Sequence, residues 1–295
     1  MRVLVTGACG LVGRHLFDLP SNDVELVGVA RNSPSRYSGD DWISADLALP
    51  GFTSRLPRDL DAIVHLAQPS GRSRKKASAL DAVDVNIRAA VELMDFARMN
   101  GVGRFVLGST ASVYRPSYGP LTETSEIGCL TTNAITKHAA ELLALQYSEH
   151  FDCRIVRIFT PYGYGQEGRL IADLIARVEA GREITVEGES GLPLSPIHAS
   201  DVARAVLRAS MDDCVAGDNG GLYNLCGPER LTVLEISQAI ALHLGVEPQL
   251  RFLPRPDPPG WSAEPKDSAI SNGRPPAITL AEGLKLTVRP GSGGD

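Results

Sequence analysis

The chain has 295 residues, 43% hydrophobic and 22% charged, which is enough for one large domain, or a domain with a smaller lobe, around a buried core. This near-average composition excludes a disordered, collagen-like or coiled-coil chain. With 29 Lys and Arg against 35 Asp and Glu, the formal net charge is −6, so we expect neither nucleic acid nor an anionic membrane surface as a partner. No apolar run reaches the roughly 18 residues that a membrane-spanning helix needs.

The cysteines are scattered and odd in number, and no two of them form a C-x-x-C pair. They are Cys9, Cys129, Cys153, Cys214 and Cys226. This pattern favours neither a disulfide framework nor structural zinc, and we expect no bound metal. The N-terminus reaches a glycine turn after a short strand and lacks the pattern of a signal peptide. These features predict a cytoplasmic protein.

Short apolar, β-branched runs alternate with helical patterns over the first two-thirds of the chain. The runs lie at 3–5, 24–29, 62–66, 104–107 and 154–158, and helical spacing of apolar residues covers 11–19 and 85–99. Nearly continuous apolar strands separated by helices indicate a parallel sheet that is covered on both faces. We therefore predict a doubly wound α/β core.

The pattern changes after about residue 160. We predict helices over 170–179 and 232–244, the second capped by Thr232, and a short strand over 184–186. The tail from Pro254 onward contains 8 of the 20 prolines, so we expect it to be mostly irregular.

A glycine-rich turn joins the first strand to the first helix. Gly7, Gly10 and Gly13 form the pattern G-x-x-G-x-x-G. The first glycine allows a tight turn, the second lets a pyrophosphate approach the backbone, and the third lets helix and strand pack closely. Leu11 and Val12 open the helix, whose free N–H groups and dipole favour the phosphates. The turn therefore predicts a dinucleotide site.

The end of the second strand bears on which dinucleotide is bound. An acidic residue there would bond the ribose 2′-hydroxyl of NAD, but the chain has Arg31 and Asn32. A guanidinium suits a 2′-phosphate, so we predict NADP(H), with NAD(H) as the alternative. Arg31 could instead stack on the adenine or face solvent. Asp46, followed by Leu47, is a candidate adenine contact.

Further motifs follow the glycine turn in a fixed order. They are His65-Leu66-Ala67 at a strand end, Asn86 in a predicted helix, a serine-rich segment at 109–114, and the segments 157–163, 197–203 and 222–225. With these residues the chain resembles the extended short-chain dehydrogenase/reductase family, in particular its NAD-dependent epimerase/dehydratase members that act on nucleotide sugars. The resemblance extends to about Asp201, and more weakly to Asp267.

The resemblance implies a Rossmann-type doubly wound parallel sheet with a smaller C-terminal substrate lobe. It assigns 1–160 and about 196–225 to a dinucleotide-binding domain, and about 161–195 and 226–295 to the lobe. It also implies that Leu66, Ala67, Gln68 and Asn86 contact the cofactor.

In that family a Tyr four residues before a Lys exchanges a proton with the substrate. The Lys lowers the pKa of the Tyr and binds the nicotinamide ribose, a Ser or Thr holds the substrate oxygen, and hydride moves between the sugar and the nicotinamide. The resemblance puts Thr110 at the hydroxyl position and Lys137 at the lysine position.

Asn133 occupies the position of the Tyr. A carboxamide has no usable pKa between about 4 and 11, so it cannot act as a general acid or base, although it can donate a hydrogen bond. Three explanations are open. Another group supplies the proton, with Tyr114, Tyr162, Tyr164 and His198 as candidates by motif. The chain is a natural pseudoenzyme that binds the cofactor. The residue is a deliberate inactivating substitution.

The chain departs from the family pattern in two other ways. Ala111 and Ser112 stand where the family's 4,6-dehydratases have an Asp-Glu pair, which disfavours that reaction. Leu194 stands where nucleotide-sugar members commonly have an Arg that meets the substrate diphosphate, which puts a diphosphate-linked sugar in doubt. Alternative cations are Arg169, Arg251, Arg255 and the basic stretch 72–76, although a solvated surface also explains each of them.

We therefore expect an NAD(P)-dependent oxidoreductase or epimerase that acts on a sugar or a related hydroxyl or carbonyl metabolite, with altered or disabled acid/base chemistry. The alternative is a non-catalytic, dinucleotide-binding regulator. A homodimer through the helices that follow Val85 and Asn133 is plausible, because apolar residues recur along the second helix.

Overall fold

The computed structural model describes residues 1–20, 23–32, 42–69, 78–211, 221–265 and 276–288. Its centre is a seven-stranded sheet in the order β11-β6-β5-β4-β1-β2-β3. All neighbours in this sheet are parallel. The strands are β1 (Arg2–Thr6), β2 (Glu25–Ala30), β3 (Trp42–Ser44), β4 (Ala62–His65), β5 (Arg104–Thr110), β6 (Asp152–Ile158) and β11 (Leu222–Leu225).

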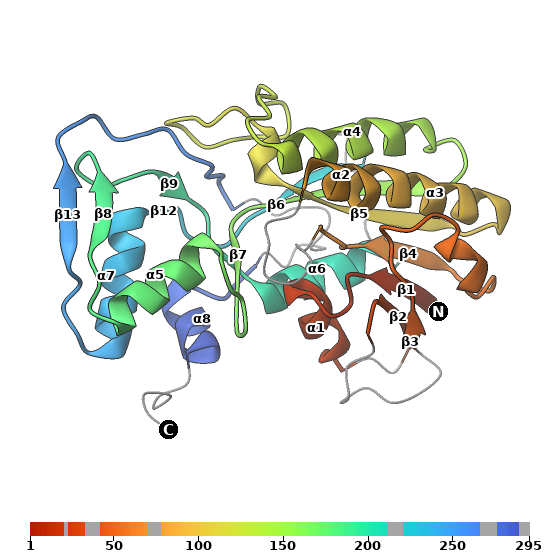
Figure 1. Cartoon of the computed structure of the whole chain (residues 1–295), viewed down its shortest axis with the longest axis horizontal. Helices are drawn as coiled ribbons and strands as arrows, with labels where there is room; N and C mark the ends of the chain where they lie inside the picture. Colours follow the sequence, from red (N-terminus) through yellow and green to blue (C-terminus); the bar gives the residue numbers. More distant parts are fainter. Residues whose placement is uncertain (21–22, 33–41, 70–77, 212–220, 266–275, 289–295) are drawn as a thin grey trace.

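Helices cover both faces of this sheet (Figure 1). α1 (Leu11–Phe17) and α6 (Ala199–Ala209) pack on one face, and α3 (Ala89–Met99) and α4 (Thr132–Gln146) pack on the other. Strand β1 shows why, because its three central residues are fully buried and alternate between the two faces. Val3 and Val5 belong to the core beneath α1 and α6, whereas Leu4 belongs to the core beneath α3. The predicted doubly wound parallel sheet is confirmed.

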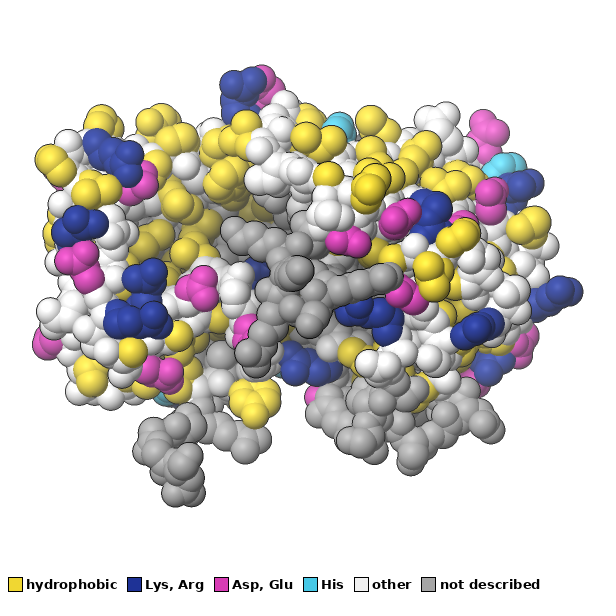
Figure 2. Space-filling view, viewed as in Figure 1, with side chains coloured by type: hydrophobic (Ala, Val, Ile, Leu, Met, Phe, Trp, Pro, Cys, Tyr) yellow, Lys and Arg dark blue, Asp and Glu magenta, His cyan; other side chains and the backbone are white. Residues whose placement is uncertain are grey.

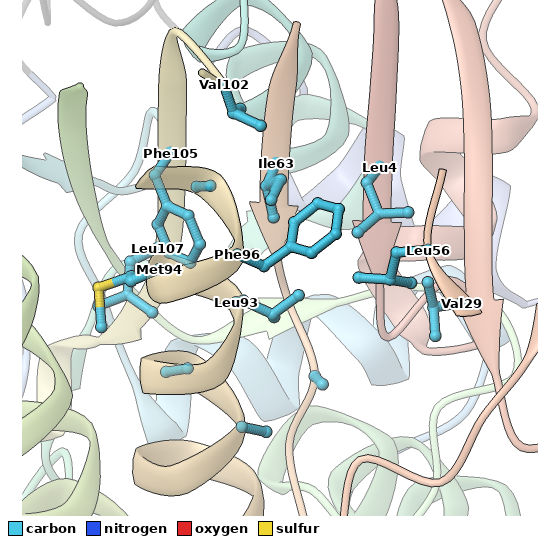
Figure 3. Packing of buried hydrophobic residues seen from close by; sticks show 14 of the residues in the cluster. Leu4, Val29, Leu56, Ile63, Leu93, Met94, Phe96, Val102, Phe105 and Leu107 are labelled. Atoms are coloured by element: carbon cyan, nitrogen blue, oxygen red, sulfur yellow. The ribbon is translucent and has the colours of Figure 1, made fainter. Parts of the chain in front are cut away.

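The core beneath α3 is built from side chains of several neighbouring strands (Figure 3). Leu4, Val29 and Ile63 come from three strands of the sheet, and Leu93 and Phe96 of α3 lie against them. Such close packing of apolar side chains fixes the spacing between helix and sheet, and with it the position of the strand ends.

The helix predicted over 85–99 is not regular throughout. After the short α2 (Ala79–Ala82), residues Val83–Arg88 form a π-helical segment, η3, which continues into α3. A π segment places an extra residue in the turn and is often found at functional sites. Asn86 lies in this segment and is fully buried.

The remaining elements form a second lobe beside the sheet, with its own apolar core (Figure 1). Its main elements are α5 (Leu170–Glu179), β8 (Ile184–Glu187), α7 (Val233–Leu244), β13 (Leu250–Leu253) and α8 (Leu280–Thr287). The predicted helices at 170–179 and 232–244 are confirmed, and Thr232 caps α7 in a capping box with Glu235. Helix α8 is an unexpected regular element in the proline-rich tail.

Several short elements complete the fold. They are η1 (Phe52–Arg55), η4 (Ala111–Val113), β7 (Pro161–Tyr162), β9 (Pro193–Leu194), β10 (Ile197–His198) and β12 (Leu231–Thr232). Strand β7 pairs with β10, and β9 pairs with β12. The chain therefore passes between sheet and lobe more than once. The division at 1–160 and 196–225 against 161–195 and 226–295 stays a prediction.

The surface carries both signs of charge. Basic and acidic side chains are interspersed on the face that Figure 2 shows. None of the helices in the described part of the chain is long and apolar enough to span a membrane. Cys9, Cys129, Cys153 and Cys226 form no disulfide, and Cys214 lies outside the described residues.

Candidate active site

The glycine turn is shaped by close backbone contacts. Gly7 has φ +71°, and its carbonyl accepts a 2.8 Å hydrogen bond from the amide of Gly10. A Cβ on Gly7 would lie 2.7 Å from the amide nitrogen of Ala67, and a Cβ on Gly13 would lie 2.4 Å from the carbonyl oxygen of Gly7. A Cβ on Gly10 would meet only the backbone of Gly7. The outer side of the turn at Gly10 is therefore open, as an approaching diphosphate requires.

The other residues predicted at the nucleotide end follow strands β2 and β3, at the same edge of the parallel sheet as this turn. Cys9 donates from its Sγ to the carbonyl of Asn32 over 3.6 Å, and Ser44 Oγ donates to the carbonyl of Arg31 over 3.0 Å. The carboxylate of Asp46 accepts the amide of Ala48 at 3.0 Å. Leu11 and Val12 begin α1, and the side chain of Leu47 is buried in the core. Contacts of these residues with a cofactor stay predictions.

Lys137 connects α4 to the carboxyl ends of two central strands. Its Nζ donates to the carbonyl of Gly108 over 2.8 Å and to the carbonyl of Ala67 over 3.2 Å. The side chain is buried, and this burial lowers the pKa of Lys137 to about 8 against the opposing charge of Glu141. Leu66 and Gln68 flank the Ala67 carbonyl. The ammonium thus lies where strands β4 and β5 end, beside the glycine turn.

Asn133 and Asn86 are joined through their side chains. Asn86 Nδ2 donates to Thr136 Oγ1 over 2.9 Å and to Asn133 Oδ1 over 3.3 Å. Thr136 Oγ1 in turn donates to the carbonyl of Thr132 over 2.9 Å. The buried Asn86 side chain therefore donates its hydrogen bonds to residues of α4. Its contact with a cofactor stays a prediction.

A cleft of about 310 Å³ opens at Asn133. Its lining consists of Gln68, Pro69, Ser78, Ala79, Ala82, Thr132, Asn133 and Arg169. Arg169 Nη2 donates to Gln68 Oε1 over 3.4 Å. In contrast, Arg251 and Arg255 form ion pairs with Glu183 and Glu187 in the lobe. Of the three single arginines considered as compensating cations, Arg169 is the one that lines this cleft; the basic stretch 72–76 lies outside the described residues.

Thr110 ends strand β5. Its Oγ1 lies 2.8 Å from Ser112 Oγ and accepts the amide of Ser112 at 3.3 Å. The hydroxyl therefore caps the short η4 helix and forms a hydrogen bond with the hydroxyl of Ser112. Leu194, at the position of the family's arginine, is buried in the core of the lobe. A diphosphate would need a different cation.

The four proton donors considered as substitutes for a tyrosine do not line the cleft at Asn133. Tyr114 donates to Asn224 Oδ1 over 2.8 Å, and burial raises its pKa. Tyr162 donates to the carbonyl of Thr279 over 3.3 Å, and burial raises its pKa as well. Tyr162 and Tyr164 line a different cavity, of about 430 Å³, beside α5. Burial lowers the pKa of His198 to about 4, so that its imidazole is neutral.

Two features of the site were not predicted from the sequence. His65 Nδ1 lies 2.7 Å from Thr6 Oγ1, and burial together with the charge of Lys137 lowers the pKa of His65 to about 3. One helical turn after Lys137, Glu141 forms a buried ion pair with Arg157 and accepts a hydrogen bond from Ser109. The signal for this pair was Arg157 among the apolar residues at the end of strand β6, where the side chains are buried.

The buried ion pair explains how α4 is held. Burial alone would raise the pKa of Glu141, but the hydrogen bonds and charge of Arg157 hold that pKa below its usual value. His138 Nδ1 lies 3.0 Å from the same carboxylate. The ion pair ties α4 to strand β6, and Ser109 ties it to β5, so the network positions Lys137.

Comparison with known proteins gives the class to which this fold and site belong. Residues 3–226 match the NAD dependent epimerase/dehydratase family, and the chain belongs to that family. The resemblance inferred from the motifs is thereby confirmed.

Relatives and solved structures cover nearly the whole chain. UDP-glucuronic acid decarboxylase 6 of Arabidopsis thaliana is 28% identical over 97% of this chain and 87% of its own. MoeE5, solved in complex with UDP-glucuronic acid and NAD, is 26% identical with a TM-score of 0.79, over 97% of both chains. UDP-glucose 4-epimerase of Thermus thermophilus, solved with NAD, is 24% identical with a TM-score of 0.78, over 97% of both chains, and supports the fold.

Proposed function

We propose that this chain is a nicotinamide dinucleotide-dependent enzyme that acts on a nucleotide sugar, as an oxidoreductase or epimerase. The carrying observation is that the glycine turn and the buried Lys137 meet at the ends of β1, β4 and β5, next to the cleft at Asn133. Relatives named for reactions of UDP-glucuronic acid, and neighbours solved with nucleotide sugars, support the substrate class. The boundary between the sheet and the lobe is where such a substrate would bind.

The cofactor would supply hydride exchange with a carbon of the sugar. Gly7, Gly10 and Gly13 would bind its diphosphate, and Lys137 would bind the nicotinamide ribose. The neighbours were solved with NAD, whereas Arg31 supports a 2′-phosphate and hence NADP(H). Native mass spectrometry with both dinucleotides in competition tests this. Arg31→Asp should shift the ratio of bound cofactors toward NAD. An unchanged ratio would mean that Arg31 does not select between the two dinucleotides.

The chain's own residues would hold the reacting oxygen. Thr110 and Asn133 would donate hydrogen bonds to it, and Asn133 would exchange no proton. Ala111 and Ser112 lack carboxylates, so we favour epimerisation or carbonyl reduction over 4,6-dehydration. The test is incubation of the purified chain with either dinucleotide and UDP-glucose or UDP-glucuronic acid, followed by NMR of the sugar and absorbance of reduced nicotinamide. Binding of neither sugar nucleotide would contradict the proposal.

Asn133 also favours a second candidate, a non-catalytic protein that binds the dinucleotide and responds to it. Asn133→Tyr separates the two. A gain of turnover of at least about 10-fold would indicate a disabled catalytic site, since general acid–base help is commonly worth about 10²–10⁴ in rate. Turnover by the unmodified chain without improvement in the variant would indicate a different proton donor. Dinucleotide binding without turnover in either form would favour the regulator.

We also propose a homodimer that uses the outer side of α4. Ile135, Leu142 and Leu145 are each at least 40% exposed on this helix. Light scattering after size-exclusion chromatography measures the mass, and Leu142→Glu should convert the dimer to a monomer. A monomeric wild-type chain would contradict this proposal.

A further inference from the structure

We infer that the cleft at Asn133 binds a carboxylate of the substrate between the Asn133 amide group and the Arg169 guanidinium. The substrate is then a nucleotide-linked sugar acid. This inference rests on the proposed nucleotide-sugar function and narrows it to one chemical class. It follows from the direction of the hydrogen bonds behind Asn133 and from the charge of the side chains that line the cleft.

Three side chains determine which end of the Asn133 carboxamide faces the cleft. The hydroxyl proton of Thr136 is used by the carbonyl of Thr132, because a carbonyl can only accept. Thr136 Oγ1 therefore accepts from Asn86, which turns the NH₂ group of Asn86 toward α4. The same NH₂ group meets Asn133, so Asn133 must offer its oxygen there. Its own NH₂ group is left for the cleft.

The opposite arrangement is less favourable. As the bonds stand, Asn86 has one buried atom without a partner, its Oδ1. Rotating the Asn86 carboxamide would bury its NH₂ group at that place, with two unpaired protons instead of one under-used oxygen. Orphaned buried N–H groups are rarer than under-satisfied carbonyl oxygens. The hydrogen bonds that link Asn133 to Asn86 and Thr136 form a relay. This relay fixes Asn133 as a hydrogen-bond donor to whatever occupies the cleft.

The charge of the cleft matches a donor at Asn133. The described residues that line the cleft include no Asp or Glu, and Arg169 is the charged residue among them. Within the part of the chain that the structure describes, no carboxylate forms an ion pair with Arg169, which donates instead to the neutral side-chain oxygen of Gln68. That bond uses the Gln68 oxygen and leaves its NH₂ group as a further donor. A site of donors and one guanidinium suits a planar oxyanion.

A carboxylate is the oxyanion that fits this place. Asn133 stands where the family's proton donor meets the sugar, so the cleft adjoins the reacting carbon rather than the nucleotide. An acidic substituent of the sugar ring would lie there. The same chemistry would also attract a phosphate of the substrate diphosphate, and the experiment separates these two sources.

The test is calorimetric binding to the full chain saturated with the dinucleotide that it binds more tightly, with UDP-glucuronic acid, UDP-glucose and UDP as probes. The wild type should bind UDP-glucuronic acid at least about 10-fold more tightly than UDP-glucose. Arg169→Gln should remove most of that preference and leave the Kd of UDP-glucose within about 2-fold, since hydrogen bonds to charged groups are worth more than neutral ones. Arg251→Gln, an equal change of charge in the lobe, should leave all three Kd values unchanged.

A pair of variants at Thr136 tests the relay separately from Arg169. Thr136→Val removes the acceptor that orients Asn86, whereas Thr136→Ser keeps it. The preference for UDP-glucuronic acid should fall several-fold in the first variant and be retained in the second, a difference that loss of stability alone would not produce. Asn133→Asp should weaken the binding of UDP-glucuronic acid at least about 10-fold more than that of UDP-glucose, because only the former carries a carboxylate that the new charge repels.

The failures can be told apart. Equal Kd values of the wild type for UDP-glucuronic acid and UDP-glucose would overturn the inference and leave the nucleotide-sugar proposal intact. An equal loss for all three probes in Arg169→Gln would assign Arg169 to the diphosphate and likewise overturn it. Binding of none of the probes would overturn the proposed function and the inference together.

Discussion

Arg157 and Glu141 meet in a two-point ion pair behind Lys137, with Nε 3.0 Å from Oε1 and Nη2 2.6 Å from Oε2. Both side chains are at most 5% exposed. Arg157 also lies over the ring of Tyr114, 4.6 Å from its centroid. A charge pair buried this deeply adds little net free energy of folding, because desolvation offsets most of the attraction. Its main effect is to hold α4 in position against β6.

Removing one partner of that pair should be costly. Arg157→Met leaves the Glu141 carboxylate buried without its counter-ion, and we expect a loss of about 3–5 kcal/mol in the free energy of unfolding. The double variant Arg157→Met/Glu141→Leu should lose clearly less than the sum of the single changes. Urea denaturation measures all three. For comparison, Arg251→Met at the exposed pair with Glu183 should cost less than about 1 kcal/mol. Additive losses at Arg157 and Glu141 would contradict this account.

His65 should make the stability depend on pH. Its pKa is lowered to about 3 in the folded chain, below the ordinary 6.5, so the unfolded chain binds more protons between these values. Stability is therefore fully present above pH 6.5 and falls as the pH is lowered toward 3. From pH 7 to pH 5 the contribution of His65 should fall by about 2 kcal/mol. His65→Gln should show a smaller drop over this interval in urea denaturation, and an identical drop would mean that folding does not lower the pKa of His65.

Lys137 should affect dinucleotide binding more than stability. Lys137→Met removes a buried charge, which favours the folded chain, but it also removes the donor to the Ala67 and Gly108 carbonyls, so the net change in the stability of the cofactor-free chain should be small. Its dinucleotide affinity should fall at least about 10-fold, because the proposed bond to the ribose is lost. Native mass spectrometry and thermal unfolding measure the two effects. Lys285→Met, at an exposed lysine on α8, is the matched control, and unchanged dinucleotide affinity in Lys137→Met would refute the assignment.

Two glycines of the turn should respond differently to alanine. Gly13→Ala would put a Cβ 2.4 Å from the Gly7 carbonyl oxygen, so both stability and binding should fall. Gly10→Ala would put a Cβ 3.0 Å from the Gly7 carbonyl oxygen, so stability should fall much less than in Gly13→Ala, whereas dinucleotide binding should weaken at least about 10-fold. Gly103→Ala, where the nearest atom is 3.7 Å away, is the control. Normal binding by Gly10→Ala would argue against a diphosphate at this turn.

The sequence allowed some of these features to be predicted and hid others. The central strands are apolar runs, and the turn glycines are required by local geometry, so both are visible without tertiary information. The bond between Arg169 and Gln68 joins residues 101 positions apart, and no local pattern indicates it. The π segment keeps the apolar spacing of an ordinary helix. Helix α8 was hidden by nearby prolines, although Thr279 and Glu282 form a capping box that the sequence displays.

The two carbonyl partners of Lys137 lead to a simple count of protons. A charged lysine has three N–H bonds, and Ala67 and Gly108 take two of them. The third can bond a ligand without releasing either strand. A neutral amine has only two, which satisfies the strands and leaves none over. With the pKa of Lys137 at about 8, a more alkaline solution should therefore remove the N–H donor that this residue can offer to a ligand. Its hydrogen bonds to the two strand ends should remain.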